Sequence, residues 1–600
     1  IDELFATVRN ADARGETPLL GILSHDFWGN PLWNQGWTHK SYRPLVILSY
    51  AFQYRFNDGI IKPQPLRAFN VLLHCTNSIL LYVLSRRYRI PRTWACLSSC
   101  LFAVHPVHCE NIIYLVGRAD ALATFCWLLA LMSWPLLRCR ELHCLSYSLR
   151  LALVIFLAIV GGLCKESGFC VLFQLAVGEL MSHKPFRGSC PLFLSFFVVF
   201  KIRSWFTQGT SAGFSFVDTP VQYHSDLTVR SFTYLYFHSK YAQLLVLPWS
   251  LSWDYSYDAL PLLRQTWQDA RFLGVLATYC GIASLASHGF AGRNRRLLFG
   301  LSNVIVPFVQ ASNLFFIVGT TIGERLLYPC NVGGALIVAA LGAQSLRADS
   351  SLKKSIGMRR HGRICAALLL LALYLYRCSV RVYQWQSREH LFEPDLKSFP
   401  RSAKSQHQYA TILHRQNRFE EAKYHFEQSL SIFSDNALSE YCIAQILIET
   451  GRPQEALSRF EHILGGHGMG FGSFNIYALY IDYGFCLMLL RRFEEAIPNL
   501  LQGLKLNEDV PHGLNALGYC YVQLRNYPEA ANSFERGLHY DAMNPWLLNN
   551  LGATLMFQGS IDRGGELIAR AGVAEPAVPA FAHNMRLLQV MVQTQSWPSE

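Results

Sequence analysis

Two adjacent acids, Asp2 and Glu3, stand at the very start of the sequence. A carboxylate can act as a general base, and burial raises its pKa toward the range in which it accepts a proton. That chemistry would require the pair to lie at a protected membrane boundary, just after a span that precedes the sequence. Adjacent acids are also common where loops begin, so the residues alone leave a structural interpretation open.

Four further polar segments carry basic residues or histidines: "THKSYRPL" (38–45), "HPVHCENIIYLVGRAD" (105–120), "CKES" (164–167) and "GERLLYP" (323–329). Cations and imidazoles at such places can bind a phosphate through charge-assisted hydrogen bonds. Ionisable residues near membrane depth often mark a substrate path, although interface anchoring and snorkelling explain some of them equally well. The candidates for binding a donor phosphate or sugar are Arg118, Lys165, Arg325, Arg43, His39 and His108.

Zinc is the other chemistry that this pattern suggests, because the spacing of His105 and His108 can place two imidazoles on one metal ion. A proline separates the two histidines and no third ligand is evident, so we expect no metal. The 17 cysteines lie mostly within apolar runs, and no pair of CxxC motifs has zinc-finger spacing. We expect buried thiols rather than a disulfide framework.

Long apolar runs must position these polar segments. The chain is 51% hydrophobic and only 16% charged, whereas soluble domains usually carry about a quarter charged residues. Runs near the ~20 residues that cross a bilayer predict helices, since only helices satisfy their own backbone hydrogen bonds in lipid. We expect helical spans at 66–85, 93–106, 119–138, 149–164, 166–182, 189–206, 270–287, 297–317, 328–346 and 364–381.

Charge in the connecting loops predicts the orientation of these spans. Lys and Arg gather in alternate loops, such as "SRRYRIPR" (85–92), "GRNRR" (292–296) and "RADSSLKKSIGMRRHGR" (347–363), which the positive-inside rule places in the cytoplasm. The polar segments, the apolar but aromatic stretch 207–269 and everything after 382 then lie on the other side. We interpret 207–269 as re-entrant or interface-lying. This bias accounts for much of the net charge of +12 without nucleic acid.

After residue 400 the sequence repeats itself. The segments "RFEEAKYHF", "RPQEALSRF", "RFEEAIPNL" and "NYPEAANSF" align on Ala422, Ala456, Ala496 and Ala530, with steps of 34, 40 and 34 residues. A small residue stands twelve positions before each alanine, and the longer step contains the glycine-rich insert "GGHGMGFGSF". The pattern predicts tetratricopeptide repeats, whose stacked helix pairs form a concave surface that usually holds an extended partner.

The motifs "HDFWGNPLW", "HKSYRPL", "HPVHCE", "GRADALA", "CKESG" and "ERLLYP", in this order and followed by such repeats, resemble the TMTC family. These are transmembrane and tetratricopeptide repeat-containing protein O-mannosyltransferases of the endoplasmic reticulum, related to other GT-C glycosyltransferases. The resemblance implies transfer of mannose from dolichyl phosphate mannose to Ser/Thr of cadherin-type domains. The lipid-linked donor is a substrate, and no cofactor is implied.

The resemblance also places an acidic pair in the first luminal loop, where this sequence has Asp2 and Glu3. Members often have two aspartates there, so Glu3 departs from the pattern and leaves open which acid is the base. One helix precedes the pair in such enzymes, which implies about eleven spans. The base would take the proton of the acceptor hydroxyl as it attacks the anomeric carbon, with inversion and without metal, while fixed cations stabilise the leaving phosphate.

We therefore predict an α-helical protein in which a polytopic GT-C-like membrane bundle is followed by a luminal tetratricopeptide-repeat solenoid. Residues 1–65 form the first luminal loop, 66–381 the membrane region, 382–402 a linker and 403–590 about five repeats. The protein would be a multi-pass endoplasmic reticulum enzyme whose partners are acceptor proteins, a polyprenyl donor and the membrane. The alternative is a non-catalytic scaffold whose repeats bind chaperones or a calcium pump. A transporter is disfavoured, because the spans show no internal repeat.

Overall fold

The computed structural model describes residues 4–33, 38, 40–134, 147–181, 185–208, 218–264, 268–315, 318–344, 353–466, 475–575, 578–581, 583–584 and 586. Apart from one isolated bridge between His25 and Pro31, the regular elements of these residues are helices. The chain forms two compact units, Ile1–Ser402 and Ala403–Glu600. The predicted architecture, a helical membrane region followed by tetratricopeptide repeats, is confirmed.

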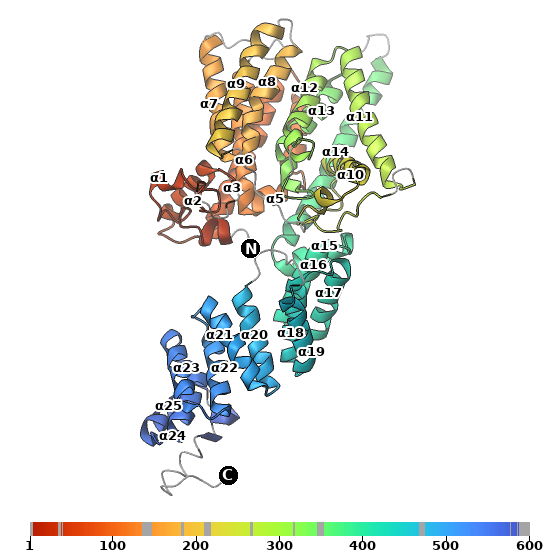
Figure 1. Ribbon diagram of the computed structural model, residues 1–600. Coiled ribbons are helices and arrows are strands. Elements are labelled where there is room, and N and C mark those ends of the chain that lie inside the picture. The colour runs from red at the N-terminus through yellow and green to blue at the C-terminus, as the bar shows by residue number, and fades with distance from the viewer. Residues whose placement is uncertain are drawn as a thin grey trace. The chain divides into compact units, whose positions relative to one another are not determined.

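The first unit is a bundle of long helices joined by short turns and helical breaks (Figure 1). Its elements are η1 (Leu4–Val8), α1 (Leu19–Ile22), α2 (Pro44–Phe56), α3 (Pro63–Arg87), α4 (Arg92–Ala103), α5 (His108–Ile113), η2 (Leu115–Gly117), α6 (Arg118–Ser133), α7 (Tyr147–Cys164), η3 (Glu166–Phe169), α8 (Cys170–Leu180), α9 (Pro185–Phe206), η4 (Pro220–Tyr223), α10 (Leu227–Val246), α11 (Arg271–Ala291), α12 (Arg295–Phe308), η5 (Val309–Ala311), η6 (Glu324–Leu327), α13 (Tyr328–Gln344), α14 (Lys353–Gln384) and α15 (Arg388–Ser398).

Seven helices among the described residues are long and apolar enough to cross a membrane. They coincide with seven of the ten expected spans and comprise Pro63–Arg87, Leu115–Ser133, Tyr147–Cys164, Gly188–Phe206, Arg271–Ala291, Glu324–Gln344 and His361–Gln384.

The other three expected spans, at 93–106, 166–182 and 297–317, are shorter than predicted. They correspond to α4, α8 and α12, which have 12, 11 and 14 residues. At 1.5 Å per residue, none of them alone reaches across a hydrocarbon core of ~30 Å. The polar segment at 105 ends α4, η3 takes the first residues of the second run, and α12 gives way to η5. The apolar runs therefore exceed the helices that they form.

The core of the bundle is built from large aromatic side chains set among small ones. Trp127, Trp134 and Tyr328 are fully buried in one apolar cluster that also contains many alanines of α6, α8 and α13. Helices α12 and α13 pack closely, because a Cβ on Gly333 would lie 2.4 Å from the backbone nitrogen of Val304. This dense packing is typical of membrane helix interfaces, where small residues let backbones approach. It gives the polar segments a rigid support.

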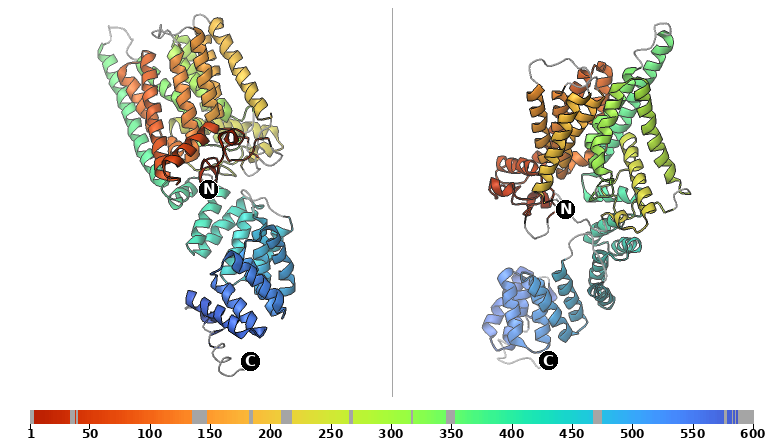
Figure 2. Two further views of the ribbon diagram at one scale, coloured as in Figure 1. Left: turned by 90° about the vertical axis from the view of Figure 1, so that its left-hand side faces the viewer. Right: turned by 45° about the horizontal axis from the view of Figure 1, so that its top comes forward.

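The described residues before α2, which we call the opening segment, lie at one end of the bundle in both views of Figure 2. Between α1 and α2 this segment forms turns: Asp26 Oδ1 accepts hydrogen bonds from the backbone nitrogens of Trp28 and Asn30, both at 2.9 Å. Its aromatic residues pack on the last turn of α9, where Trp33 Nε1 donates to the carbonyl of Phe206 at 3.0 Å. The tryptophan-rich sequence thus attaches a loop to the end of an apolar helix.

Helices also form in the stretch interpreted from the sequence as re-entrant or interface-lying and in the stretch interpreted as a linker. The stretch 207–269 contains η4 and α10, and α10 buries Tyr236, Phe237 and Tyr241 in an apolar cluster of its own. The stretch 382–402 contains the end of α14 and all of α15. Both α10 and α15 lie at the same end of the unit as the opening segment (Figure 1).

The second unit consists of consecutive helical hairpins. They are α16 (Ala403–Arg415) with α17 (Phe419–Ile432), α18 (Ala437–Glu449) with α19 (Pro453–Leu464), α20 (Ile476–Leu489) with α21 (Phe493–Leu506), α22 (Pro511–Gln523) with α23 (Tyr527–Tyr540), and α24 (Pro545–Phe557) with α25 (Ile561–Ala574). Most of the glycine-rich insert, residues 467–474, lies outside the described residues.

Small residues allow the two helices of each hairpin to approach closely, as the repeat pattern predicts. The four aligned alanines are fully buried. A Cβ on Gly518 would lie 2.5 Å from the ring of Phe534, and one on Gly552 would lie 2.6 Å from the carbonyl oxygen of Gly564. Larger residues there would push the paired helices apart. This explains why each repeat has a small residue at these positions.

Candidate functional site

The "CKESG" segment forms a sharp break between two apolar helices. Lys165 is extended between the end of α7 and η3, so the chain turns before α8 begins. A Cβ on Gly168 would lie 2.2 Å from the carbonyl carbon of Gly161, so only glycine lets η3 lie directly against α7. The break thereby holds Lys165 and Glu166 at the end of the bundle, beside the opening segment.

Glu166 is held by two guanidinium groups from distant parts of the chain. Arg43 Nη2 lies 3.1 Å from Glu166 Oε2, and Arg203 Nη2 lies 3.0 Å from Oε1. We call Arg43, Glu166 and Arg203 the Glu166 cluster. Arg43 lies over the ring of Phe27 and Arg203 over that of Tyr42, at 5.6 and 5.2 Å. Stacking on aromatic rings fixes the direction of both guanidinium groups.

The Glu166 cluster has more hydrogen-bond donors than it uses. The nitrogens Nε of Arg43 and Nη1 of Arg203 are buried and have no hydrogen-bond partner among the described residues. The two arginine side chains are 17% and 12% exposed, whereas Glu166 is 36% exposed. The cluster is therefore open to solvent on the side of its carboxylate and retains unpaired N–H groups, which is the arrangement that an incoming anion needs.

The protonation of Glu166 follows from these neighbours. Burial favours the neutral acid, but the charges of Arg43 and Arg203 outweigh it and lower the pKa of Glu166 to about 2. Beside it, Lys165 Nζ lies 2.5 Å from Asp120 Oδ1, and both side chains are largely buried. Burial lowers the pKa of Lys165, Asp120 opposes that effect, and the charge of Arg43 adds to it. The charge of Arg43 therefore acts on both Lys165 and Glu166.

A second contact joins the segments "HPVHCE" and "GERLLYP". Glu110 Oε2 accepts a hydrogen bond from the backbone nitrogen of Arg325 at 2.9 Å, and its Oε1 lies 3.4 Å from the Arg325 guanidinium. Asn111 Nδ2 donates to the carbonyl of Arg325 at 3.2 Å. The charge of Arg325 also lowers the pKa of Lys165. Three of the polar segments therefore meet electrostatically at this end of the bundle.

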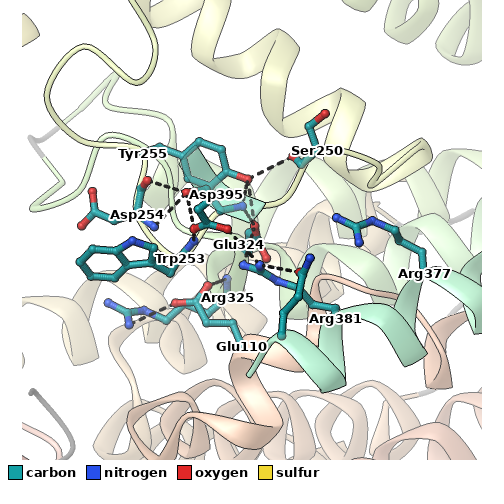
Figure 3. A network of polar contacts seen from close by, with 12 residues as sticks. Glu110, Ser250, Trp253, Asp254, Tyr255, Glu324, Arg325, Arg377, Arg381 and Asp395 are labelled. Carbon is teal, nitrogen blue, oxygen red and sulfur yellow. Dashed lines mark hydrogen bonds and ion pairs between the residues drawn. The ribbon is translucent and has the colours of Figure 1, made fainter. Parts of the chain in front are cut away.

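A third group of charges lies deeper and is fully enclosed. Arg381 of α14 lies 3.7 Å from Glu324 Oε1 and 3.3 Å from Asp395 Oδ1 of α15, and the three side chains are 0%, 0% and 1% exposed. We call these residues the Arg381 cluster. Their side chains gather in Figure 3 beside the loop that carries Tyr255. One cation here faces two carboxylates.

Hydroxyls and main-chain N–H groups complete the Arg381 cluster. Asp395 Oδ2 accepts from Ser252 Oγ at 2.9 Å and from the backbone nitrogen of Trp253 at 2.7 Å. Glu324 Oε1 accepts from the backbone nitrogen of Ser252 at 2.7 Å and from the Tyr255 hydroxyl at 2.8 Å. Four segments, η6, the 250–255 loop, α14 and α15, are thus tied together by buried polar contacts.

The structure brings some of the predicted site residues together and separates others. Arg43, Lys165 and Arg325 meet at the end of the bundle. Arg118 lies deeper, where Nε, Nη1 and Nη2 donate to Asn70 Oδ1, Ser49 Oγ and the Leu66 carbonyl at 2.8 to 2.9 Å. Those neutral partners favour a structural role for Arg118.

Of the predicted histidines and acids, the structure describes only His108. His108 is buried between Phe102 and Tyr328, and its Nε2 accepts from Asn331 Nδ2 at 2.9 Å. Asp2, Glu3 and His39 lie outside the described residues, so their roles stay predictions. No three His, Cys, Asp or Glu side chains gather as a metal site would need in the part of the chain that the structure describes.

Sequence reasoning missed Arg203 and the Arg381 cluster. Arg203 stands in the last turn of an apolar helix, within "KIRSWF", where we treated it as the end of a span. The available signal was a cation on the side that the positive-inside rule predicts to be non-cytoplasmic. Arg381 is the last residue of the span expected at 364–381, and Asp395 lies in the stretch 382–402 that the sequence interpretation treats as a linker. Only the fold shows that they meet Glu324.

A row of side-chain amides runs through the second unit. Asn550 Nδ2 donates to Asn515 Oδ1 at 2.9 Å, Asn549 Nδ2 donates to Asn550 Oδ1 at 3.1 Å, and Asn584 Nδ2 donates to Asn549 Oδ1 at 2.9 Å. The row links the first helices of successive hairpins, α22 and α24, to the residues that follow α25. Each carboxamide has two donors and two acceptor lone pairs, so a bonded amide keeps capacity for a further partner.

Residues 208–283 match the model of a protein family described as "Protein O-mannosyl-transferase TMTC, DUF1736". Among curated proteins, human Protein O-mannosyl-transferase TMTC4 is 31% identical in an alignment 457 residues long that covers 67% of this chain and 59% of the relative. Human TMTC1 is 30% identical over 480 residues, with 71% and 52% covered. Drosophila melanogaster Tmtc1 is 28% identical over 511 residues, with 70% and 58% covered. The chain spans about half to three fifths of the length of these relatives.

Among solved structures, the crystal structure of YrrB, described as a TPR protein with an unusual peptide-binding site, has a TM-score of 0.28 at 21% identity. It covers 34% of this chain and 100% of that one. The matched family segment contains the 250–255 loop that completes the Arg381 cluster. Given its motif order, its helical architecture and these relatives, the chain belongs to the TMTC family.

Proposed function

We propose that the chain is part of a membrane O-mannosyltransferase that moves mannose from dolichyl phosphate mannose to Ser/Thr hydroxyls of secretory-pathway proteins. The observation that carries the proposal is the Glu166 cluster, in which two guanidinium groups converge on one partly exposed carboxylate where apolar helices end. A polyprenyl phosphate needs such a place: cations for its phosphate next to apolar helices for its tail. The family membership supplies the reaction class.

The phosphate of the donor would bind to Arg43 and Arg203. A guanidinium pairs with a phosphate through parallel hydrogen bonds, in the same way as it pairs with a carboxylate. The unpartnered Nε of Arg43 and Nη1 of Arg203 would add to those bonds. Glu166 now occupies the position of an anion between the two arginines, so the donor would displace it or bind beside it. Lys165 and Arg325 would contribute longer-range positive charge.

The chemical step is a single displacement. The acceptor hydroxyl oxygen forms a bond to the anomeric carbon while the bond from that carbon to the phosphate oxygen breaks, which inverts the anomeric centre. Asp2 or Glu3 would take the proton of the hydroxyl, as the resemblance implies. The leaving polyprenyl phosphate is stabilised by the arginines, whose positive charge is fixed before the reaction begins.

The repeats would hold the acceptor polypeptide on the luminal side of the endoplasmic reticulum membrane. The amide row from Asn515 to Asn584 supports this part of the proposal. A side-chain carboxamide offers the same donor and acceptor groups as a peptide bond, so a row of them matches the main chain of an extended peptide. Cadherin-type domains, which consist of exposed strands, are the acceptors that the resemblance implies.

The test is mannose transfer by the purified full-length protein, with dolichyl phosphate mannose as donor and a cadherin-type domain as acceptor. Mass spectrometry of the acceptor measures the added hexose. We expect transfer by the wild type, loss of transfer in either Asp2→Asn or Glu3→Gln, and weakened donor use in Arg43→Gln. Arg55→Gln, which changes an exposed arginine at the end of α2, is the matched control.

Each outcome discriminates between the two functions considered. Transfer that disappears in one acid variant while donor binding persists identifies the base. Absence of both transfer and donor binding in the wild type, across several acceptor domains, would replace the enzyme with a non-catalytic scaffold that displays the repeats to chaperones or a calcium pump.

A further inference from the structure

Two cysteines that are far apart in the sequence meet beside the polar segments. The Sγ atoms of Cys109, on α5, and Cys378, on α14, lie 3.6 Å apart, and 269 residues separate them in the chain. A covalent disulfide is shorter, at about 2.05 Å, so the two thiols are in contact but not bonded. Cys109 is buried, whereas Cys378 is partly exposed.

The surroundings of this pair connect it to the charge clusters. Cys109 directly precedes Glu110, which binds the backbone of Arg325. Cys378 stands three residues before Arg381 on α14, close to one helical turn away and on the same face. The pair therefore lies between the segment that positions Arg325 and the helix that carries the Arg381 cluster. A disulfide at this place would fix α14 relative to the segment that positions Arg325.

We infer that Cys109 and Cys378 form a disulfide that fastens α14 to α5 when the protein is in an oxidising compartment. Cys109 lies in a segment that the charge of the loops assigns to the non-cytoplasmic side, and Cys378 lies near that end of the span His361–Gln384. Disulfides form and persist on that side. The inference uses that placement but does not depend on mannose transfer. It also modifies the expectation from the sequence: the cysteines form no framework, but two of them form one link across the bundle.

The exposures of the two thiols suggest the order of the reaction. The thiolate of Cys378, the more exposed of the two cysteines, attacks one sulfur of an oxidised dithiol such as a protein disulfide or oxidised glutathione. The first thiol of the oxidant leaves, and Cys378 carries a mixed disulfide. The thiolate of Cys109 then attacks the Cys378 sulfur and releases the second thiol. Two cysteines lose two protons, and the two electrons reduce the oxidant.

The disulfide would stabilise the membrane unit because it closes a long loop of the unfolded chain. A cross-link between residues this far apart removes many conformations from the unfolded ensemble. It would also keep α14 in register with α5 without relying on the buried ion pairs alone. Cys96 and Cys100, by contrast, lie one turn apart on the same helix, α4, so a disulfide between them would not join two helices.

Disulfide mapping of the intact protein tests the inference. The full-length protein is expressed in secretory-pathway membranes, its free thiols are blocked with N-ethylmaleimide at lysis, and it is digested without reduction. We expect a cross-linked peptide pair that contains Cys109 and Cys378, has lost two hydrogen masses and separates on reduction. Recovery of both cysteines as alkylated thiols overturns the inference, whatever the protein does with mannose.

Variants distinguish a specific link from general oxidation. In Cys378→Ser the Cys109 peptide should appear only as a free peptide, and a reductant should no longer lower the melting temperature. Cys330→Ser removes another buried cysteine and should leave both the linked peptide and the effect of the reductant as in the wild type. An unchanged effect of reductant in Cys378→Ser would contradict the assignment.

Discussion

The Glu166 cluster and the Arg381 cluster lie in the same helical unit, yet their charges are arranged in opposite ways. In the first, two arginines share one carboxylate that is 36% exposed, and buried N–H groups stay unpaired. In the second, one arginine faces two carboxylates, and hydroxyls and backbone N–H groups donate to their oxygens. Nε and Nη2 of Arg381 are also buried without a hydrogen-bond partner, so the two clusters differ in solvent exposure and in the ratio of cations to carboxylates. Excess donors open to solvent suit anion binding, whereas excess acceptors sealed from solvent suit structural support.

This difference has a physical reason. Removing a charge from water costs several kcal/mol unless good partners replace the water. The Arg381 cluster offsets that cost with four hydrogen bonds from the 250–255 loop, two to Glu324 Oε1 and two to Asp395 Oδ2. The Glu166 cluster keeps its carboxylate partly hydrated, and a ligand phosphate would find the arginines desolvated and in position. A mutation should therefore damage stability in one cluster and activity in the other.

The largest effect that we predict is the loss of stability in Arg381→Met. The variant leaves Glu324 and Asp395 buried without their cation, which should lower the free energy of unfolding by about 3–5 kcal/mol. The melting temperature of the detergent-solubilised protein measures the change. The double variant with Asp395→Asn should recover part of the loss. Arg14→Met, in a partly exposed pair with Glu16, should change stability by less than about 1 kcal/mol.

Arg203→Gln should have the opposite profile: little change in melting temperature but a large loss of transfer. Removing one fixed donor to the departing phosphate should reduce transfer about 100-fold, or about 2.7 kcal/mol of transition-state stabilisation. The mannose transfer assay measures it. Lys201→Gln changes an exposed cation two residues earlier on α9 and serves as the matched control. Equal activity of the two variants would remove Arg203 from the donor site.

The sequence predicts the general fold because the fold depends on local patterns. Apolar runs predicted the long helices, and the repeated alanines predicted the hairpins of the second unit. The three shortened spans show the limit of this reasoning, because polar residues and 3-10 turns at the ends of a run decide where its helix stops. The composition of an apolar run does not show where its helix ends.

The candidate site could be predicted only in part. Arg43, Lys165 and Arg325 stand out because they are basic residues within motifs that the charge of the loops predicts to lie on the less basic side of the membrane. Their partners do not: Arg203 lies at the end of an apolar run, and Asp395 lies in a stretch that resembles a linker. Contacts between residues more than a hundred positions apart depend on tertiary packing, to which a single sequence gives no direct access.

Acid should affect the two clusters in opposite directions. The folded-state pKa of Glu166, about 2, lies below the ~4.3 of an unfolded chain. Its contribution to stability is therefore complete above about pH 5 and is lost as the pH falls through about 2. Burial raises the pKa of Asp395 even though Arg381 opposes this, so protonation favours the folded state and acid stabilises that site.

Melting temperatures between pH 7 and pH 3 test this contrast. The stability of the wild type relative to Glu166→Gln should decrease as the pH falls, by a small amount because solvent screens the partly exposed carboxylate. The stability of the wild type relative to Asp395→Asn should increase over the same range. If both differences change in the same direction, the two carboxylates do not differ as their surroundings indicate.

The smallest predicted effect is a tighter interaction with the donor in Glu166→Gln. In the wild type a donor phosphate competes with the Glu166 carboxylate for Arg43 and Arg203. A neutral amide competes less, so the KM for dolichyl phosphate mannose should fall about fivefold, or roughly 1 kcal/mol. Glu16→Gln, at an exposed pair in the same opening segment, should leave KM unchanged. A higher KM in Glu166→Gln would mean that the carboxylate aligns the arginines for the donor, and the openness of this cluster would then be part of its architecture rather than a vacant binding position.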